Sequence, residues 1–482
     1  MKIVHLSTTS NEGGAGRAAY RLHKGLRKLG LDSKMVVCQA RDSDEKVLTF
    51  APTLQSTNLA FRFRRYLERH VKVIRDALRL PRLRSQTAPL PHDDSLQPSA
   101  YELFWGGRCC GTDELIRFLP DADIVNLHWV SQFLDLPKFF YTIGGKLPIV
   151  WTLHDMNAFT GGCHYDIGCR KYLDGCGKCP QLGSNLRDDP SRVAWLLKQK
   201  IYSSVPSHAL HIVTPSTWLG RLAAQSPLLS RFAVSVIHNG VDTEAFAPRD
   251  KAFSRSILGI PAEDPVILFL ADTLRNKRKG YTLLSQAIRD LKEERPLLWI
   301  LNVGKASERI QFTRRFISLG EVFNERLLSL AYSASDVFVI PSLQDNLPNV
   351  MLESLACGTP VVGFKVGGIP DAIKPGRTGL LVPVGDTGAL KEAVASLLDD
   401  ASPRRKMADT CRQVAIQEFN LTVQGAKYAK LYETLCEALL YSLSSVPPHF
   451  STSWEPGQPL RIRDYSHNQA VQTMGSTAQR RS

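Results

Sequence analysis

Short apolar runs alternate with helical segments in two successive series, and this alternation is the feature that most constrains the fold. The first series opens with the run Lys2–Leu6, continues with a helical stretch that places Leu22 and Leu26 on one face, and returns to an apolar run at Ser33–Cys38. Because runs that alternate with helices pair as parallel strands, the sequence predicts an α/β fold. The later strand-like runs are Ile124–His128, Ile149–Leu153 and His211–Thr214, followed by Val266–Ala271, Leu298–Val303, Asp336–Ile340, Thr359–Gly363 and Gly379–Val382.

The two series predict two doubly wound parallel-sheet domains. We expect an N-terminal domain over residues 1–247 and a C-terminal domain over residues 248–420, joined in the polar stretch Pro248–Asp264. Residues 40–110 are irregular between strands and are predicted to be an insertion. The remaining segments are predicted to be a closing helix at residues 421–443 and a disordered tail, rich in Pro, Ser, Gln and Gly, at residues 444–482.

The hydrophobic pattern argues against export and against a membrane-spanning segment. The longest apolar runs, such as Val266–Ala271, are far shorter than the ~20 residues that a membrane helix needs. The first residues, Met1–Thr9, lack the basic region, the long apolar core and the cleavage site of a signal peptide. We therefore expect a cytoplasmic protein whose cysteines are mostly reduced.

Positive charge is concentrated in one segment. The chain has a net charge of +14, and Arg62–Arg84 contains nine basic residues against Glu68 and Asp76. Apolar residues recur there at three- and four-residue steps, which predicts a basic amphipathic helix. Such a helix can lie on the anionic inner face of a membrane, or it can pack its apolar stripe on the protein and leave the charges in water. A nucleic-acid partner is disfavoured, because no recognition module accompanies the charge.

The segment Pro341–Val362 contains the most informative pattern. A buried strand runs into a loop in which Asn346 is expected to cap a helix, with Pro348 in its first turn. Asp345 precedes that helix, and Glu353 lies within it. The free N–H groups of a helix start favour an anion such as a diphosphate, while carboxylates accept hydrogen bonds from sugar hydroxyls.

At these residues the chain resembles glycosyltransferase family 4, the retaining nucleotide-sugar transferases of GT-B fold. The family motif has an acidic residue, seven others and then Glu, here Asp345 and Glu353, followed by a string similar to Ala356–Val362. The resemblance implies two Rossmann-like domains that face a cleft. It also implies that Asp345, where the family usually has Glu, contacts the transferred sugar and that Glu353 binds the nucleotide ribose. Backbone amides at Asn346 and Leu347 would contact the sugar or the phosphate.

A basic loop after the strand Val266–Ala271 supports the same resemblance. Family members often carry Arg, five residues and then Lys-Gly, and both cations bind the donor diphosphate. Lys279 matches the second part, whereas the arginine position falls on Thr273, so Arg275 or Arg278 would supply the missing charge. Protein cations can stabilise a diphosphate as its negative charge grows, so no metal cofactor is expected in catalysis.

Two N-terminal motifs belong to the acceptor side of this resemblance. Gly13 and Gly14 open the first helix, where glycine lets the backbone approach a ligand, as in the family. His154 follows a strand end, the edge at which open α/β sheets bind ligands, and the family implies a functional histidine here. The second strand does not end in an acid, which argues against NAD, and a Gly-x-Ser-x-Gly hydrolase elbow is absent. His154, Asp345 and Lys279 are therefore the expected catalytic residues.

Four cysteines form a separate cluster within the N-terminal series. Cys163, Cys169, Cys176 and Cys179 include one Cys-x-x-Cys pair. A structural zinc ion is one interpretation, and free thiols, disulfides or an iron–sulfur centre are the alternatives.

These patterns lead to one functional hypothesis and two alternatives. The hypothesis is a retaining glycosyltransferase that moves a sugar from a nucleoside diphosphate sugar to a glycan or lipid-linked acceptor, in bacterial exopolysaccharide or lipopolysaccharide synthesis. A nucleotide-sugar epimerase of the same fold is the first alternative. A catalytically inert protein that binds a membrane surface through Arg62–Arg84 is the second.

Overall fold

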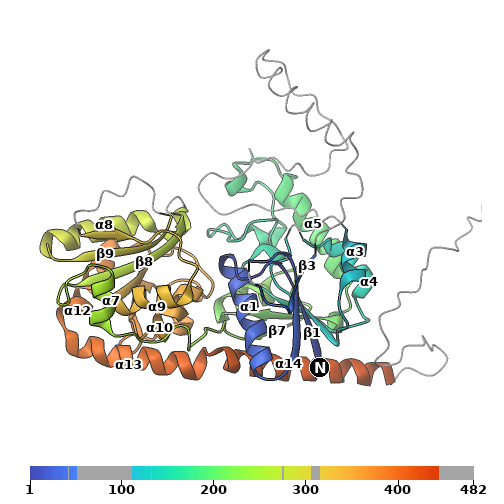
Figure 1. Ribbon diagram of the computed structural model, residues 1–482. Coiled ribbons are helices and arrows are strands. Elements are labelled where there is room, and N and C mark those ends of the chain that lie inside the picture. Colours follow the sequence, from blue (N-terminus) through green and yellow to red (C-terminus); the bar gives the residue numbers. More distant parts are fainter. Residues whose placement is uncertain (42, 51–110, 132, 274–275, 306–314, 445–482) are drawn as a thin grey trace, which may run out of the picture.

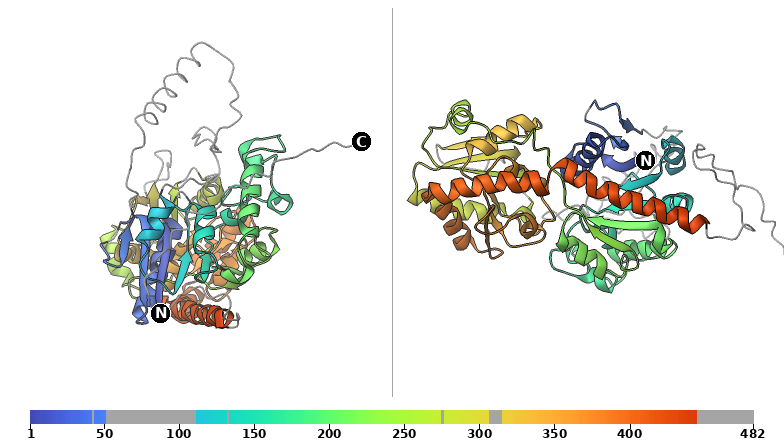
Figure 2. Two further views of the ribbon diagram at one scale, coloured as in Figure 1. Left: turned by 90° about the vertical axis from the view of Figure 1, so that its right-hand side faces the viewer. Right: turned by 90° about the horizontal axis from the view of Figure 1, so that it is seen from below.

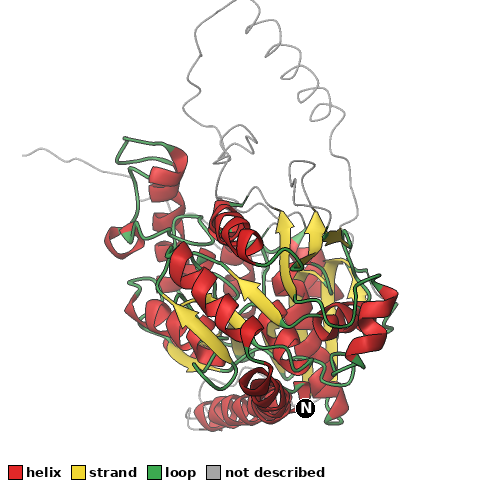
Figure 3. Ribbon diagram, turned by 90° about the vertical axis from the view of Figure 1, so that its left-hand side faces the viewer, coloured by secondary structure: helices red, strands yellow, loops and turns green. Residues whose placement is uncertain are grey.

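The computed structural model describes residues 1–41, 43–50, 111–131, 133–273, 276–305 and 315–444. Nearly all of the predicted insertion, with Arg62–Arg84, falls outside these residues, as do Arg275 and residues 445–482 of the predicted tail. The described strands form two parallel sheets, one in each half of the chain, with helices on both faces of each (Figures 1 and 3). The fold class is therefore the predicted α/β class.

The first sheet orders its strands β3-β2-β1-β4-β5-β6-β7. This is a doubly wound order, in which the chain starts in the middle at β1 and reverses direction between β1 and β4. The strands are β1 (Lys2–Thr9), β2 (Asp32–Gln39), β3 (Val47–Thr49), β4 (Ile124–Leu127), β5 (Ile149–Thr152), β6 (Leu210–Thr214) and β7 (Ala233–Val236), and the helices are α1 (Gly13–Lys28), α3 (Thr112–Phe118), α4 (Leu136–Ile143), α5 (Pro190–Ser203) and α6 (Thr217–Gln225).

The second sheet orders its strands β10-β9-β8-β11-β12-β13, with the reversal between β8 and β11. Ligands of such sheets bind beyond the carboxyl ends of the strands at the reversal, so the loops after β1, β8 and β11 are the expected sites. The strands are β8 (Val266–Thr273), β9 (Trp299–Lys305), β10 (Phe316–Ser318), β11 (Val337–Ile340), β12 (Val361–Phe364) and β13 (Gly379–Val382), and the helices are α7 (Lys251–Ile257), α8 (Tyr281–Glu294), α9 (Glu325–Ala334), α10 (Asn349–Ala356), α11 (Ile369–Ala372), α12 (Thr387–Asp399) and α13 (Ala401–Glu418).

The last described helix, α14 (Leu421–Ser444), leaves the C-terminal half and returns to the first sheet. Figure 2 shows α13 and α14 running one after the other beneath the two halves. Tyr428 and Tyr432 are fully buried there, and the Tyr432 hydroxyl accepts a hydrogen bond of 2.7 Å from the Asn126 amide. At Gly25 of α1 an added Cβ would lie 2.4 Å from the carbonyl oxygen of Leu421, so glycine lets the two helices approach closely. In the part of the chain that the structure describes, no helix has the length and apolar character of a membrane span.

Candidate functional site

Asp345 lies in the loop after β11, at the reversal of the second sheet. Its Oδ2 atom is 2.8 Å from Lys279 Nζ and 3.3 Å from Arg278 Nη1, and it accepts a hydrogen bond from Ser342 Oγ. Burial alone would raise the pKa of this carboxyl group, but the two cations outweigh it and hold the pKa well below its usual range. Asp345 is therefore a buried acceptor between two cations, and it is ionised near neutral pH.

The two cations come from the loop between β8 and α8. Gly280 is the N-cap residue of that helix, with φ 69°, and an added Cβ would lie 1.8 Å from the Pro341 carbonyl oxygen. Only glycine therefore lets the basic loop pack against the loop that carries Asp345. Of the two predicted arginines, the structure places Arg278 in the site, whereas Arg275 lies outside the described residues. The Arg278 guanidinium also lies over the ring of Tyr165, 4.1 Å from its centre.

The expectation that Asn346 caps the following helix is wrong. Helix α10 begins at Asn349 with Pro348 at its N-cap, and the Asn346 side chain instead reaches the other half of the molecule. Its amide donates to the His154 carbonyl oxygen at 3.0 Å, and its oxygen accepts from Ser216 Oγ. The neighbouring Leu347 is buried. Asn346 thus joins the predicted donor loop to the strand end that carries His154.

The predicted glycines lie at the start of α1, facing the same loop. Gly13 has φ 65°, and the Gly14 carbonyl oxygen accepts a hydrogen bond of 2.9 Å from the Asn349 side chain of α10. An added Cβ at either glycine would meet no atom within 4 Å. The backbone here therefore borders empty space, in keeping with the predicted approach of a ligand.

His154 is the end of a row of three imidazoles that the sequence patterns did not reveal. His5 Nδ1 lies 3.0 Å from His128 Nε2, and His128 Nδ1 lies 3.1 Å from His154 Nε2. His5 is on β1, His128 directly follows β4 and His154 follows β5, so three adjacent strands supply the row. A histidine within or directly after each of three central strand-like runs was the available signal, but only the strand order places the three side by side.

The row constrains the protonation of His154. Burial lowers the pKa of His5 and His128 well below the usual value and that of His154 to about 4, so all three rings are neutral near pH 7. A neutral imidazole has one donor and one acceptor nitrogen, so every proton in the row must point the same way. His154 uses Nε2 within the row, so its Nδ1 atom lies outside the row.

Glu353 is fully buried on α10 and pairs across the domain junction. Arg21 Nη2 of α1 lies 2.8 Å from Glu353 Oε1 and 3.0 Å from Glu325 Oε1, and Tyr332 donates its hydroxyl hydrogen to Glu353 Oε2. Burial alone would lower the pKa of Arg21, but the two carboxylates outweigh it and raise the pKa. Arg21 was not predicted, because no local motif marks it. Together with Glu353 it borders a cavity of about 400 Å³, also lined by Asn11, Arg17, Arg41, Phe323, Glu325 and Leu328.

The segment that contains the four cysteines also reaches the loop of Gln344 and Asp345, the predicted donor loop. The four predicted cysteines line one small cavity. Residues between the first two cysteines contact the other half of the molecule. Asp166 accepts a hydrogen bond of 2.9 Å from the Gln344 amide, and the Tyr165 hydroxyl lies 3.4 Å from Asp345 Oδ1. The site is therefore built from both sheets.

Comparison with known proteins identifies the second sheet. Residues 264–400 match the family model described as "Glycosyl transferases group 1". The chain contains a group 1 glycosyltransferase domain. The resemblance to glycosyltransferase family 4 is confirmed, and so is the predicted GT-B fold of two α/β domains.

The curated relatives of this chain that follow match less than half of its length. It is 30% identical over 239 residues to D-inositol 3-phosphate glycosyltransferase 2 of Catenulispora acidiphila, which covers 46% of this chain and 55% of the relative. It is 30% identical over 232 residues to the alpha-maltose-1-phosphate synthase of Mycobacterium tuberculosis, covering 44% of this chain and 59% of the relative. The chain thus spans about half the length of the curated relatives it matches.

Solved structures align with nearly the whole chain. Sucrose-phosphate synthase from Thermosynechococcus elongatus aligns with 91% of this chain and 100% of its own at a TM-score of 0.59 and 17% identity. HepE from Anabaena, solved in complex with UDP, aligns with 90% of this chain and 100% of its own at a TM-score of 0.54 and 17% identity. At 17% identity, the similarity of these structures is evidence for the fold alone.

Proposed function

We propose that this protein is a retaining glycosyltransferase that moves a sugar from a nucleoside diphosphate sugar to a glycan or lipid-linked acceptor. The observation that carries the proposal is the meeting of Asn346 with His154 and of Asn349 with Gly14, because these pairs are 192 and 335 residues apart in sequence. A donor-binding motif and an acceptor-side motif thus face one another. The HepE structures solved with UDP and with UDP-glucose support a nucleotide-sugar donor.

Each group in the site has a role in this reaction. Lys279 and Arg278 would bind the diphosphate and stabilise the negative charge that grows on it as the sugar leaves. Asp345 would accept hydrogen bonds from sugar hydroxyls, and Glu353 from the ribose. His154 would orient the sugar through Nδ1. The acceptor would attack from the face that the diphosphate leaves, and the leaving phosphate oxygen would take the acceptor proton, so catalysis needs no divalent metal.

The proposal includes a pathway and a location. Bacterial exopolysaccharide or lipopolysaccharide synthesis fits a transferase with a lipid-linked acceptor, and such acceptors lie at the cytoplasmic face of the inner membrane. The basic segment Arg62–Arg84 supports peripheral contact with that surface, because each basic residue near an anionic membrane contributes ~1 kcal/mol.

A donor panel tests the proposed reaction. The full chain is incubated with UDP-, GDP-, ADP- and dTDP-sugars, and release of the nucleoside diphosphate is measured with and without acceptor sugars, sugar phosphates and lipid-linked sugars. We expect release from one donor, stimulated by one acceptor, and retention of the anomeric configuration in the product. Binding of no nucleotide sugar would contradict the proposal. An epimerised nucleotide sugar without acceptor product would favour the epimerase alternative.

A further inference from the structure

We propose that Cys163, Cys169, Cys176 and Cys179 bind one zinc ion, which fixes the segment that reaches from the N-terminal domain to the donor loop. This site is independent of the proposed reaction, because its ion would be structural.

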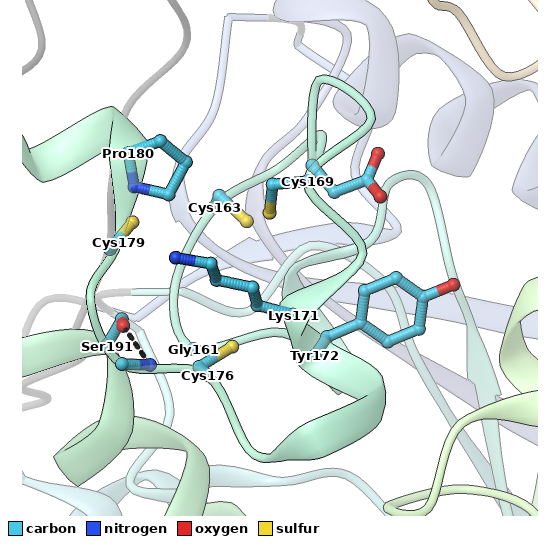
Figure 4. A pocket seen from close by; sticks show the side chains of 11 residues that line it. Gly161, Cys163, Cys169, Lys171, Tyr172, Cys176, Cys179, Pro180 and Ser191 are labelled. Carbon is cyan, nitrogen blue, oxygen red and sulfur yellow. Dashed lines mark hydrogen bonds between the residues drawn. The ribbon is translucent and has the colours of Figure 1, made fainter. Parts of the chain in front are cut away.

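The first support is that the four side chains line the same cavity. All four line a single cavity of about 10 Å³, as Figure 4 shows, and all four are free thiols. A space of this size holds about one water molecule or one ion. The other residues that line it are Gly161, Asp166, Lys171, Tyr172, Gly177, Pro180 and Ser191. The Lys171 side chain extends among the cysteines and its ammonium group donates to the Lys178 carbonyl oxygen, so it would have to move aside when an ion binds. A cavity lined by four sulfurs offers ligands for a soft cation, since thiolates select zinc and copper(I) over magnesium or calcium.

The second support is the number of ligands. Structural zinc sites typically have four protein ligands and no coordination position left for water or substrate. Four cysteines supply such a tetrahedral set, with Zn–S distances of ~2.3 Å. In the structure, which holds no ion, the four sulfurs do not have the arrangement of a metal site. Among the described residues, no group of three or more His, Cys, Asp or Glu side chains lies close enough together to hold a metal ion. Zinc would draw the four side chains inward by rotation about their χ1 angles, and each thiol would lose its proton as it binds.

The third support is the backbone of the Cys-x-x-Cys turn. Cys176, Gly177 and Lys178 follow one another with φ values of 59°, 91° and 46°, all in the left-handed region. Such conformations cost non-glycine residues ~1 kcal/mol or more each and persist only where the surroundings impose them. Two hydrogen bonds hold the turn to the start of α5, from Gly177 N to Ser191 Oγ and from Cys179 N to Asp189 Oδ2. An ion bound by both cysteines would impose the same geometry.

The fourth support is the length of irregular chain that has to be held in place. Between β5 and α5, residues 153–189 contain short 3-10 turns but no strand or α-helix. Irregular stretches of this length inside a folded domain are uncommon and need a reason for their order. This stretch carries Tyr165 and Asp166 to the donor loop. A zinc ion would cross-link it and so keep those two side chains in reach.

Metal analysis of the full chain tests the site. The protein is purified without chelators or metal-affinity steps, and zinc, iron and copper are measured per chain. We expect about one zinc per chain in the wild type and almost none in the double variant Cys176→Ser/Cys179→Ser. The matched control is Cys436→Ser, which removes another half-buried thiol outside the cluster and should keep the zinc.

A thiol count decides the matter if the double variant does not fold. In the native wild type, the four cluster thiols should react slowly with a thiol reagent, and removal of zinc by a strong chelator should make four more thiols reactive and lower the melting temperature. Wild type without zinc that also takes up none under reducing conditions would overturn the proposal. Stoichiometric iron, or thiol reactivity that does not change on chelation, would overturn it as well.

Discussion

Asp345 is the residue at which the cations of the C-terminal domain and the cysteine-containing segment of the N-terminal domain meet. Lys279 Nζ lies 2.8 Å from one of its carboxylate oxygens, and the Tyr165 hydroxyl lies 3.4 Å from the other. A bound sugar hydroxyl and a diphosphate would compete for the same groups. In the proposed reaction the internal ion pair would hold both partners in position before the donor binds.

Replacement of Lys279 tests the role of its charge. We expect Lys279→Ala to lower kcat by about 10²–10³-fold and to change donor affinity much less, because the diphosphate gains charge in the transition state. Steady-state kinetics with the donor found in the panel would measure both. Lys277→Ala, in the same turn, is the control and should keep nearly full turnover. A variant with normal kcat and a raised KM would contradict this role.

The histidine row predicts a loss of stability in acid. The folded-state pKa values of His5 and His128 are lowered by burial, so below the unfolded value near 6.5 the unfolded chain binds protons that the folded chain does not. Stability should fall as the pH drops from about 6.5 to 5, by about 2 kcal/mol for each such histidine.

Denaturant unfolding at pH 7.5 and pH 5 measures this effect. His5→Phe should lower stability at both values but reduce the difference between them by about 2 kcal/mol. Val4→Ala on the same strand is the control, because it removes buried apolar surface without removing a titrating group. An unchanged difference in His5→Phe would mean that His5 is not buried in its neutral form.

The sequence identified the residues whose motifs are local and missed those that depend on strand order. Asp345, Glu353 and Lys279 lie in recognisable strings, whereas Arg21 and His128 reach the site only because distant elements pack side by side. Asn346 was predicted as a site residue, but its predicted contact, the cap of the following helix, was wrong. Its position before Pro348 looked like a cap, and a carbonyl and a hydroxyl of the other domain bind it instead.

Among the elements, buried central strands were predicted well, whereas three of the four edge strands were missed; the fourth, β13, has buried residues at both ends and was predicted. β4, β5, β11 and β12 are buried along their whole length, so they appear as continuous apolar runs. β7 lies at a sheet edge with no buried residue, so its sequence carries no such run, and β3 and β10 were missed for the same reason. The stretch Pro248–Asp264, read as a plain polar join, contains α7, which Asp250 caps by accepting from Phe253 N.

Arg21 of α1 pairs with one carboxylate on α9 and one on α10, and replacing these two carboxylates should have different effects on nucleotide-sugar binding. Glu353→Gln and Glu325→Gln each remove one carboxylate from Arg21. If Glu353 binds ribose, Glu353→Gln should weaken nucleotide-sugar binding by ~1.5–3 kcal/mol, a loss of about 10–150-fold, as expected for a charge-assisted hydrogen bond. Glu325→Gln should stay within about threefold of the wild type.

Calorimetric titration with the nucleotide sugar distinguishes the outcomes. Equal losses of nucleotide-sugar affinity in Glu353→Gln and Glu325→Gln would show that binding depends on the charge around Arg21. Glu353 would then have no separate role in binding the ribose. Unchanged affinity in both variants would remove Glu353 from the donor site.

At the scale of the whole molecule, α14 makes the N-terminal domain depend on the end of the chain. Its buried Tyr428 and Tyr432 pack with Leu22, Leu26 and Val150 of the first sheet and its helix. Burying each large side chain contributes ~1.5–3 kcal/mol, and whole domains are stable by only ~5–15 kcal/mol. Loss of this helix would therefore remove a large part of the unfolding free energy of the N-terminal domain.

A pair of truncations tests that dependence. A chain ending at residue 420 should lose the cooperative unfolding transition of the N-terminal domain and aggregate, while its C-terminal domain still unfolds cooperatively in calorimetry. A chain ending at residue 444 keeps α14 and should unfold like the full chain. Equal melting curves for the two truncations would show that the N-terminal domain is stable alone.

The segment outside the described residues supplies a prediction about membranes. Vesicles rich in anionic lipid should sediment the protein at low salt and release it at high salt, because salt screens the charges of Arg62–Arg84. Replacing Arg62, Arg64, Arg65 and Arg69 with Gln should abolish sedimentation. If wild type and variant sediment alike, the proposed membrane contact is wrong.

The path of α14 has a consequence for synthesis on the ribosome. Roughly 200 residues separate the end of β7 from the end of α14, and translation at ~5–20 residues per second takes about 10–40 s to make them. During that interval the first sheet is complete while Leu22 and Leu26 still lack their cover. The domain made first is thus expected to finish folding last, and a nascent chain stalled within the second domain should bind a holdase chaperone.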